Sequence, residues 1–376
     1  MDRCFQTIAC LVTLVCVLVA AACGKSGVSA TRAAPSSPRL TVLVADGGHL
    51  DWLLAPGGRV VFDRAGADGY FDIWVMNPDG TSQRNLTEGK RELPGRHIGQ
   101  PAWHPSGRFI AFQAEKAGLP SWIKGKTEPG AGVLNDLWLM DAEGQRFWKL
   151  IDLRLDTSAD APAILHPHFS PDGSRLTWAE RVGRGPKAFG SWVIRLAEFA
   201  FQDGQPILLN LRTLTPGQPS PRPGQGAFYE THGFYPDGSR LLFSSDVDQG
   251  LKLYELELAT GRLRRLTHDP RVWDEHAHYS PDGSRILYMS SEGLVSRVRP
   301  FDLQTEFWLM KPDGTERRRL TGFHEPGHPH YRGGGFAVAA DSAWRADGKA
   351  FAGLVIRYRP ETERRGEGEI VLVELE

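Results

Sequence analysis

The sequence has very little cysteine, and all of it lies near the N-terminus. The four cysteines fall within the first 23 residues, and the rest of the chain contains none. A mature protein cut at that point would therefore have neither a disulfide nor a catalytic thiol. The chain also lacks an excess of either charge, because 44 basic and 45 acidic side chains nearly cancel among 376 residues. This balance gives no support to nucleic-acid binding, and we expect no nucleic-acid partner.

One apolar run, from Phe5 to Ala22, stands at the N-terminus behind a single arginine. Its length and small-residue end are typical of an export signal, which we expect to cover residues 1–22. The run closes with the letters AAACG, which resemble a bacterial lipobox, and this resemblance implies that Cys23 is lipidated. A plain secretory signal cut near Ala22 and a single transmembrane anchor are the alternatives.

Residues 23–39 are small, polar and proline-containing, which predicts a flexible tether after the signal. We therefore expect an exported protein of the cell envelope that a lipid anchor holds on a membrane. The residue after Cys23 is glycine rather than the aspartate that marks inner-membrane retention in enteric bacteria. By resemblance to that system, the sequence favours an outer-membrane lipoprotein that faces the periplasm.

A pattern of about a dozen residues recurs six times in the rest of the chain and defines an internal repeat. Its clearest copy is SPDGSRILYMSS, in which proline and Asp-Gly favour a tight turn. The β-branched and aromatic residues that follow the turn are typical of a half-buried strand. The six copies lie at residues 55–65, 104–115, 170–180, 235–246, 280–291 and 345–356.

Each complete repeat continues with a strand rich in Trp or Tyr, a second glycine turn and a Leu-Thr or Leu-Ile pair. This order predicts four antiparallel strands per repeat, which is one blade of a β-propeller. The sequence therefore predicts an all-β fold, a six-bladed β-propeller over residues 40–376. The sixth repeat lacks a fourth strand, and we expect Leu40–Val44 to supply it by pairing beside Glu369–Leu375, so that the N-terminal and C-terminal strands close the ring.

The repeats resemble those of the TolB family, WD40-like propeller repeats with a Pro-Asp turn. The shared letters are S-P-D-G-S, then I-W-V-M-x-x-D-G and R-x-L-T, and the resemblance covers roughly residues 40–376. It implies a six-bladed propeller and a place in the cell envelope. Only a short tether precedes blade one here, whereas TolB carries a further α/β domain, so the partner of TolB is not carried over. The repeats also resemble prolyl-oligopeptidase propellers, but no G-x-S-x-G motif is present.

The long insertions of the repeat all fall in turns that a propeller places on one face. The second turn of a blade and the connection to the next blade share that face, whereas the tight Asp-Gly turns lie on the other. Loops on a rigid scaffold commonly carry the binding site, so we expect function on this looped face. The insertions are 114–134, 181–190, 292–304 and 358–367, with a long connection at 322–340.

The innermost strand of each blade begins on the looped face and carries one polar residue five positions before the turn proline. We expect these residues to surround the mouth of the central channel as a hydrated rim that binds a ligand. The expected ligand-binding residues are Asp51, Gln100, His166, Thr231, His276 and Asp341, together with His168, His278 and Glu275.

Four of these residues, His166, His168, His276 and His278, repeat a histidine pair in blades three and five. Histidine beside carboxylate suits a divalent metal or acid–base chemistry, so these four are possible metal ligands. A polar, hydrated channel mouth with no ligand would show the same residue types, and this alternative stays open.

Two functions follow from this pattern. The first is a non-enzymatic, membrane-tethered propeller that binds an envelope protein, peptide or glycan at the channel mouth. The alternative is a metal-assisted envelope enzyme, such as a carbohydrate lyase or hydrolase, that uses the histidine cluster. Oligogalacturonate lyases resemble this chain distantly in setting histidines on propeller strands.

Overall fold

In the part of the chain that the computed structural model describes, 24 β-strands form six sheets of four strands each. The structure describes residues 37–119, 123, 126–185, 189–218, 226–294, 303–333, 335–358 and 366–375. The predicted signal peptide and the lipidation site at Cys23 lie outside these residues. Within the described ranges, no helix is both long and apolar enough to cross a membrane.

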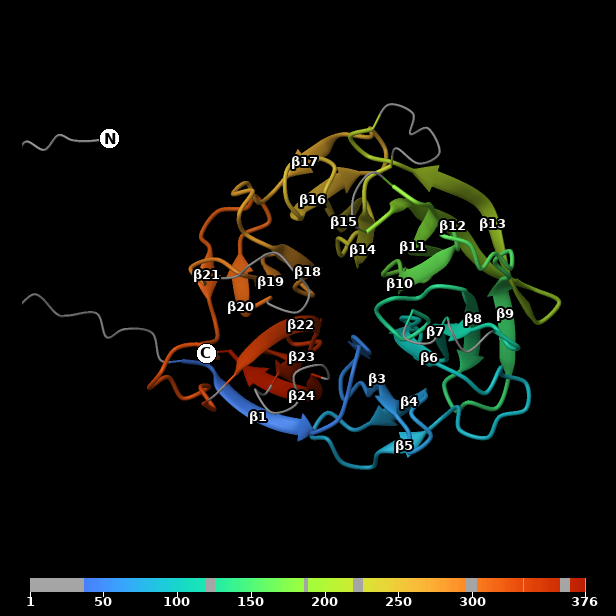
Figure 1. The fold of residues 1–376 in the computed structure, drawn as a ribbon, viewed down its shortest axis with the longest axis horizontal. Helices are drawn as coiled ribbons and strands as arrows, with labels where there is room; N and C mark the ends of the chain where they lie inside the picture. The colour runs from blue at the N-terminus through green and yellow to red at the C-terminus, as the bar shows by residue number, and fades with distance from the viewer. Residues whose placement is uncertain are drawn as a thin grey trace, which may run out of the picture. The chain divides into compact units, whose positions relative to one another are not determined.

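The six sheets are the blades of a propeller arranged in a ring (Figure 1). In every complete blade the strands follow chain order from the centre outward, as in a meander. Blade one contains β2 (Leu50–Trp52), β3 (Val60–Ala65), β4 (Phe71–Met76) and β5 (Arg84–Asn85), and blade two contains β6 (Ile98–Trp103), β7 (Phe109–Glu115), β8 (Asn135–Asp141) and β9 (Phe147–Ile151). Blade three contains β10 (Ala163–Phe169), β11 (Arg175–Gly183), β12 (Ser191–Gln202) and β13 (Gln205–Leu214), and blade four contains β14 (Tyr229–Phe234), β15 (Arg240–Ser245), β16 (Lys252–Glu257) and β17 (Leu263–Arg265).

Blades five and six complete the ring, and blade six is built from both ends of the described chain. Blade five contains β18 (Asp274–Tyr279), β19 (Ile286–Ser290), β20 (Glu306–Met310) and β21 (Arg318–Arg319), and blade six contains β22 (Phe336–Trp344), β23 (Ala350–Tyr358), β24 (Glu367–Glu374) and β1 (Arg39–Val44). The first strand pairs antiparallel with β24 over residues 39–44, which places β1 (blue) beside β24 (red) in Figure 1. The predicted six-bladed fold and its closure by the terminal strands are both confirmed.

The repeated turn and the strand after it explain how each blade forms. In the clearest copy, the Asp282 carboxylate accepts hydrogen bonds from the Ser280 hydroxyl and from the backbone amide of Ser284. Gly283 adopts a φ of 70°, which glycine accepts without strain. The following strand buries all five of its residues, Ile286–Ser290, against neighbouring blades. Similar runs pack the core between blades, where Trp178, Phe112 and Phe243 are fully buried. This packing holds the inner strands in place around the channel.

Candidate functional site

A cavity of about 610 Å³ opens on the face where the long loops lie. Its wall includes residues from the β7–β8 insertion, the β9–β10 connection and the turn before β12, as the repeat predicted for a shared face. Three of these residues are Lys126, Ser158 and Phe189. The structure therefore places a sizeable cavity on the looped face of the propeller.

Aromatic side chains form one side of this cavity. The rings of Phe189 and Phe228 lie 5.4 Å apart, and those of Trp192 and Phe228 lie 5.6 Å apart. Trp273 completes the group, with its ring 5.8 Å from that of Phe189. This aromatic wall, defined as Phe189, Trp192, Phe228 and Trp273, offers flat apolar surface to a ligand.

The floor of the cavity is polar and comes from the inner strands, several of which carry a β-bulge at the same position. The pairing register shifts there in blades two to six, as between Leu165 and His168 of β10. At the bulge, Gln100, His166 and His276 adopt φ values of 47°, 48° and 47°. Positive φ is uncommon for residues other than glycine, and such strain persists where the surrounding structure enforces it, often at functional sites. The bulge thus re-aims these side chains toward the channel.

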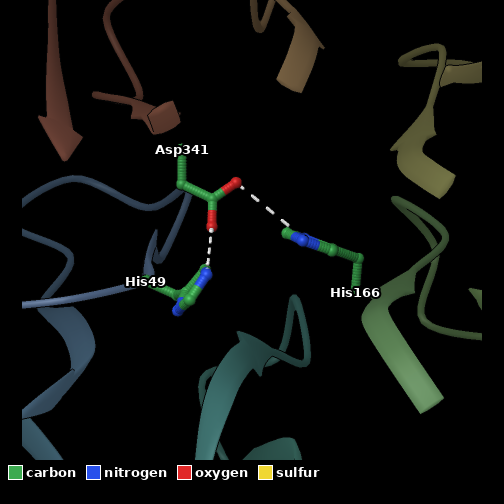
Figure 2. Close-up of side chains that lie close together, drawn as sticks. All are labelled: His49, His166 and Asp341. Carbon is green, nitrogen blue, oxygen red and sulfur yellow. Dashed lines mark ion pairs between the residues drawn. The ribbon is translucent and has the colours of Figure 1, made fainter. Parts of the chain in front are cut away.

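Asp341 of β22 links three histidines from different blades. Its Oδ1 lies 2.8 Å from Nδ1 of His276 and 3.8 Å from Nδ1 of His166, while its Oδ2 lies 3.8 Å from Nε2 of His49. Figure 2 shows the Asp341 carboxylate between the His49 and His166 rings. The rings of His166 and His276 are 5.2 Å apart, so the channel brings blades three and five together.

The charges in this group follow from burial and from these contacts. Burial lowers the pKa of His166 to about 3, so this imidazole is neutral. Burial also opposes a charge on His276, but the neighbouring carboxylates, Asp341 first and then Glu230, together outweigh it and raise the pKa of His276 to about 10. Although burial acts in the other direction, the charge of His276 holds the pKa of Asp341 well below its ordinary value. The floor therefore contains an imidazolium–carboxylate pair beside a neutral imidazole.

Two glutamates occupy equivalent positions in blades four and five, each one residue before the polar position of the repeat. Oε1 of Glu230 lies 2.7 Å from Nε2 of His166, and Oε2 of Glu275 lies 3.9 Å from Nε2 of His276. Burial, together with the negative charge of Glu230, raises the pKa of Glu275 well above its ordinary value. The indole of Trp273 donates to Glu275 at 2.7 Å, which ties the aromatic wall to the floor.

Asp63 and Gln100 hold the histidines in place. The Asp63 carboxylate accepts hydrogen bonds from the backbone amides of His49 and Gln100, both at 2.9 Å, and its Oδ2 lies 3.2 Å from Nδ1 of His49. The backbone amide of His166 donates to Oε1 of Gln100 at 3.0 Å, and the Gln100 amide nitrogen lies 2.8 Å from Nε2 of His166. Gln100 is therefore a positioning residue for His166.

His168 and His278 lie in a different place from the other two predicted histidines. Their rings are 5.6 Å apart in a second cavity of about 380 Å³, which the Pro-Asp turns of the opposite face line. Burial, reinforced by neighbouring histidines, lowers the pKa of both to about 3. The expected metal set of four histidines thus divides into two pairs on two levels of the channel. His232 lies between the levels, with its ring 5.7 Å from that of His276.

Asp51 and Thr231, two further residues of the predicted rim, make contacts that support the backbone. The Asp51 carboxylate accepts hydrogen bonds from the backbone amides of Trp52 at 2.8 Å and Trp103 at 2.7 Å. Thr231 is fully buried, and its hydroxyl donates to the carbonyl oxygen of His166 at 2.7 Å. The other four polar positions of the repeat form a connected group in the floor. Gln100 contacts His166, and both His166 and His276 lie beside Asp341.

The prediction that these residues form a hydrated rim at the channel mouth is wrong, because their side chains are buried inside the channel. The side chains of His166 and Asp341 are 6% and 7% exposed, and that of His276 is 13% exposed. A substitution that removes one partner of these ion pairs would leave a buried charge, so it would also cost stability.

Four residues in or next to the floor were not predicted from the sequence: His49, Asp63, Glu230 and His232. Glu230 and Glu275 share a position in the repeat, so the prediction of Glu275 could have been extended to Glu230. His49 precedes an inner strand of only three residues, Leu50–Trp52, which departs from the pattern of the other blades.

Two groups of side chains in the described residues could hold a metal ion. One is His49, His166 and Asp341, and the other is His166, Glu230 and His276; in each group the ligand atoms lie within 4.8 Å of one another. Neither group contains His168 or His278. Histidine with carboxylate is a donor set that suits divalent transition metals.

The ring of six antiparallel blades around a polar channel defines the chain as a six-bladed β-propeller. No family model matches the sequence. TolB of Anaeromyxobacter sp. (strain K), a Tol-Pal system protein, is 26% identical over 227 residues, which cover 58% of this chain and 45% of TolB. Dipeptidyl-peptidase 5 of Porphyromonas endodontalis is 24% identical over 245 residues, which cover 58% of this chain and 33% of the peptidase. The chain is thus similar to TolB in sequence over part of its length, and its fold is that of a six-bladed β-propeller.

Solved structures agree with this fold. TolB from Acinetobacter baumannii has a TM-score of 0.52 at 15% identity, and the match covers 85% of this chain and 64% of that one. A puromycin-hydrolyzing peptidase of Mycobacterium tuberculosis has a TM-score of 0.50 at 15% identity, with coverage of 90% and 47%. The matches thus cover less than two thirds of each of these relatives, and at this identity they show the fold alone.

Proposed function

We propose that this chain is a TolB-like propeller of the cell envelope that binds a peptide, a glycan or a protruding segment of an envelope protein in the looped-face cavity. The observation that carries the proposal is the cavity itself, which combines the aromatic wall with a charged floor. Binding sites for small ligands commonly measure about 300–1,000 Å³ and combine apolar walls with a few placed polar groups. The cavity of about 610 Å³ falls within that range.

The size and lining of the cavity favour a short chain as ligand. A folded partner could not enter this space, whereas a few sugar rings or residues of peptide could. Indole and phenyl faces such as Trp192 and Phe228 can stack on a sugar ring or on an apolar side chain. Glu230 and His276 could then bind hydroxyl or amide groups at the floor.

Location in the envelope rests on the N-terminal sequence and on the TolB relatives. The chain would be exported and held at the membrane, most simply the outer membrane, by lipid on Cys23. Substitution Cys23→Ala should release the protein from the membrane fraction or leave it unprocessed. A variant that still fractionates and migrates like the wild type would exclude lipidation at this residue.

The ligand can be sought with the tryptophans of the wall as reporters. Titration of the purified protein with peptidoglycan fragments, neutral and acidic oligosaccharides and short peptides should change tryptophan emission for one class. Phe228→Ala should weaken that binding, whereas the matched control Phe201→Ala, an exposed aromatic of the β12–β13 hairpin, should leave it unchanged. Equal effects of the two substitutions would argue against the cavity as the binding site.

A second candidate function is a metal-assisted carbohydrate lyase or hydrolase at the same floor. It is favoured by one observation, the buried Glu275 beside the His166–Glu230 contact, because burial raises the pKa of Glu275 well above its ordinary value and such a carboxyl group can act as a proton donor. Incubation with the bound oligosaccharide and analysis of its products would separate the two functions. Unchanged ligand after long incubation, with and without divalent metal, would leave binding as the function.

A further inference from the structure

The contact between Nε2 of His166 and Oε1 of Glu230 cannot be explained by the two side chains alone. The backbone amide of His166 donates to Oε1 of Gln100, and this fixes the orientation of the Gln100 side-chain amide. Its NH₂ group therefore faces Nε2 of His166, 2.8 Å away, and donates to it. Nε2 is thus an acceptor, yet the carboxylate oxygen of Glu230 lies only 2.7 Å from it.

Two acceptors this close repel each other unless a proton or a cation lies between them. The Glu230 side chain is 5% exposed, and among the described residues its Oε2 accepts no hydrogen bond of good geometry. The His276 imidazolium lies beside it, with a ring nitrogen within 4.8 Å of the carboxylate, but this leaves the contact with Nε2 of His166 uncompensated. A buried carboxylate oxygen without a partner is costly. A cation bound between Nε2 of His166 and Oε1 of Glu230 would remove the repulsion between these two acceptors and compensate the buried charge of Glu230.

His276 supplies a third ligand in the same place. Its Nδ1 faces Asp341 at 2.8 Å, which leaves Nε2 as the nitrogen available to the site. In a metal-binding histidine, the ring nitrogen that does not bind the metal commonly contacts a carboxylate. This contact orients the ring and makes the histidine a stronger ligand. The strained backbone at both histidines, with φ near +48°, holds the rings in this orientation.

We infer that Nε2 of His166, Oε1 of Glu230 and Nε2 of His276 bind one divalent first-row transition metal, with Asp341 positioning His276. The inference deepens the proposed ligand site, because the metal would lie in the floor of that cavity and present an open coordination position to the ligand. Two imidazoles and one carboxylate favour Zn²⁺, Mn²⁺ or Fe²⁺ over Mg²⁺ and Ca²⁺, which prefer oxygen. Binding would replace the proton on His276 and the Gln100 hydrogen bond to His166.

The test is metal binding itself, so it does not require the ligand of the cavity. Untagged protein, stripped with chelator, is titrated with Zn²⁺ and with Mn²⁺, and bound metal is measured by mass spectrometry after gel filtration. We expect about one equivalent bound, a rise in melting temperature with metal, and no rise with Mg²⁺. Glu230→Gln and His166→Ala should remove the binding, and Asp341→Asn should weaken it about 10–100-fold.

Matched controls come from histidines outside this triad. His168→Ala and His278→Ala alter the second cavity, and His328→Ala alters the connection before β22; all three should retain metal. The inference is overturned if stripped wild-type protein takes up neither metal, which would mean that a shared proton joins His166 and Glu230. It is also overturned if Glu230→Gln, which keeps the shape of the side chain, binds metal as well as the wild type. Loss of metal only in His328→Ala would assign the binding to the surface.

Discussion

His276 of blade five and Asp341 of blade six form an ion pair between neighbouring inner strands, with Nδ1 and Oδ1 2.8 Å apart. Both side chains are at most 13% exposed. Removing either partner leaves the other charge buried, which typically costs about 3–5 kcal/mol. The pair therefore connects the stability of the propeller to the geometry of its candidate site.

A double-mutant cycle on metal-free protein measures this coupling. His276→Ala and Asp341→Ala should each destabilise, and the double variant should lose about 1–3 kcal/mol less than the sum of the two. Urea unfolding followed by circular dichroism gives the free energies. Additive losses would mean that the two side chains do not stabilise each other.

Asp51 should make stability depend on pH. Burial outweighs its two backbone hydrogen bonds and raises the pKa of Asp51 from 3.8 to about 7. Folding therefore takes up a proton in this range, so the free energy of unfolding should fall as the pH rises from about 4 to about 7, by an amount on the order of a few kcal/mol. Asp51→Asn should flatten this slope, and the exposed control Asp203→Asn should not. The same slope in both variants would contradict the assignment.

The pairing of β1 with β24 should contribute a large part of the free energy of unfolding. Deleting residues 39–44 exposes the edge of β24 and removes Val44, which is 3% exposed, from the core. Each buried backbone group left unpaired costs about 1–3 kcal/mol, so we expect a loss of several kcal/mol and a much lower melting temperature. The control Arg39→Ala changes a side chain that is 79% exposed and should have little effect. An unchanged melting temperature for the deletion would show that β24 does not need this partner.

A buried ion pair between blades four and five should be equally sensitive. Nζ of Lys252 lies 2.8 Å from Oδ2 of Asp274, and the two side chains are 0% and 1% exposed. Lys252→Ala should therefore cost about 3–5 kcal/mol, since Asp274 stays buried. Lys311→Ala breaks an ion pair with Glu316 that is 50% and 67% exposed, and it should cost about 0–1 kcal/mol. Similar decreases in melting temperature for Lys252→Ala and Lys311→Ala would contradict this account.

The fold could be predicted from the sequence because its signal is periodic. The turn proline and Asp-Gly mark the same hairpin six times, and Leu40–Val44 had no place in blade one. The site was predicted only in part, since His166, His276 and Asp341 follow the repeat but His49 does not. The division between His166 and His168 depends on the bulge in β10, where one residue leaves the ladder and re-aims its side chain. No composition or spacing in a single strand shows such a bulge.

The central claim is that the ligand lies in the looped-face cavity, above the floor formed by His166, Glu230 and His276. A crystal structure of the protein with the peptide or oligosaccharide found by fluorescence tests it most directly. The account predicts ligand density against the aromatic wall, with a polar ligand atom within hydrogen-bond distance of Glu230 or His276, or joined to them by a metal ion. Density in the second cavity beside His168 and His278, or on the outer surface of the blades, would contradict it.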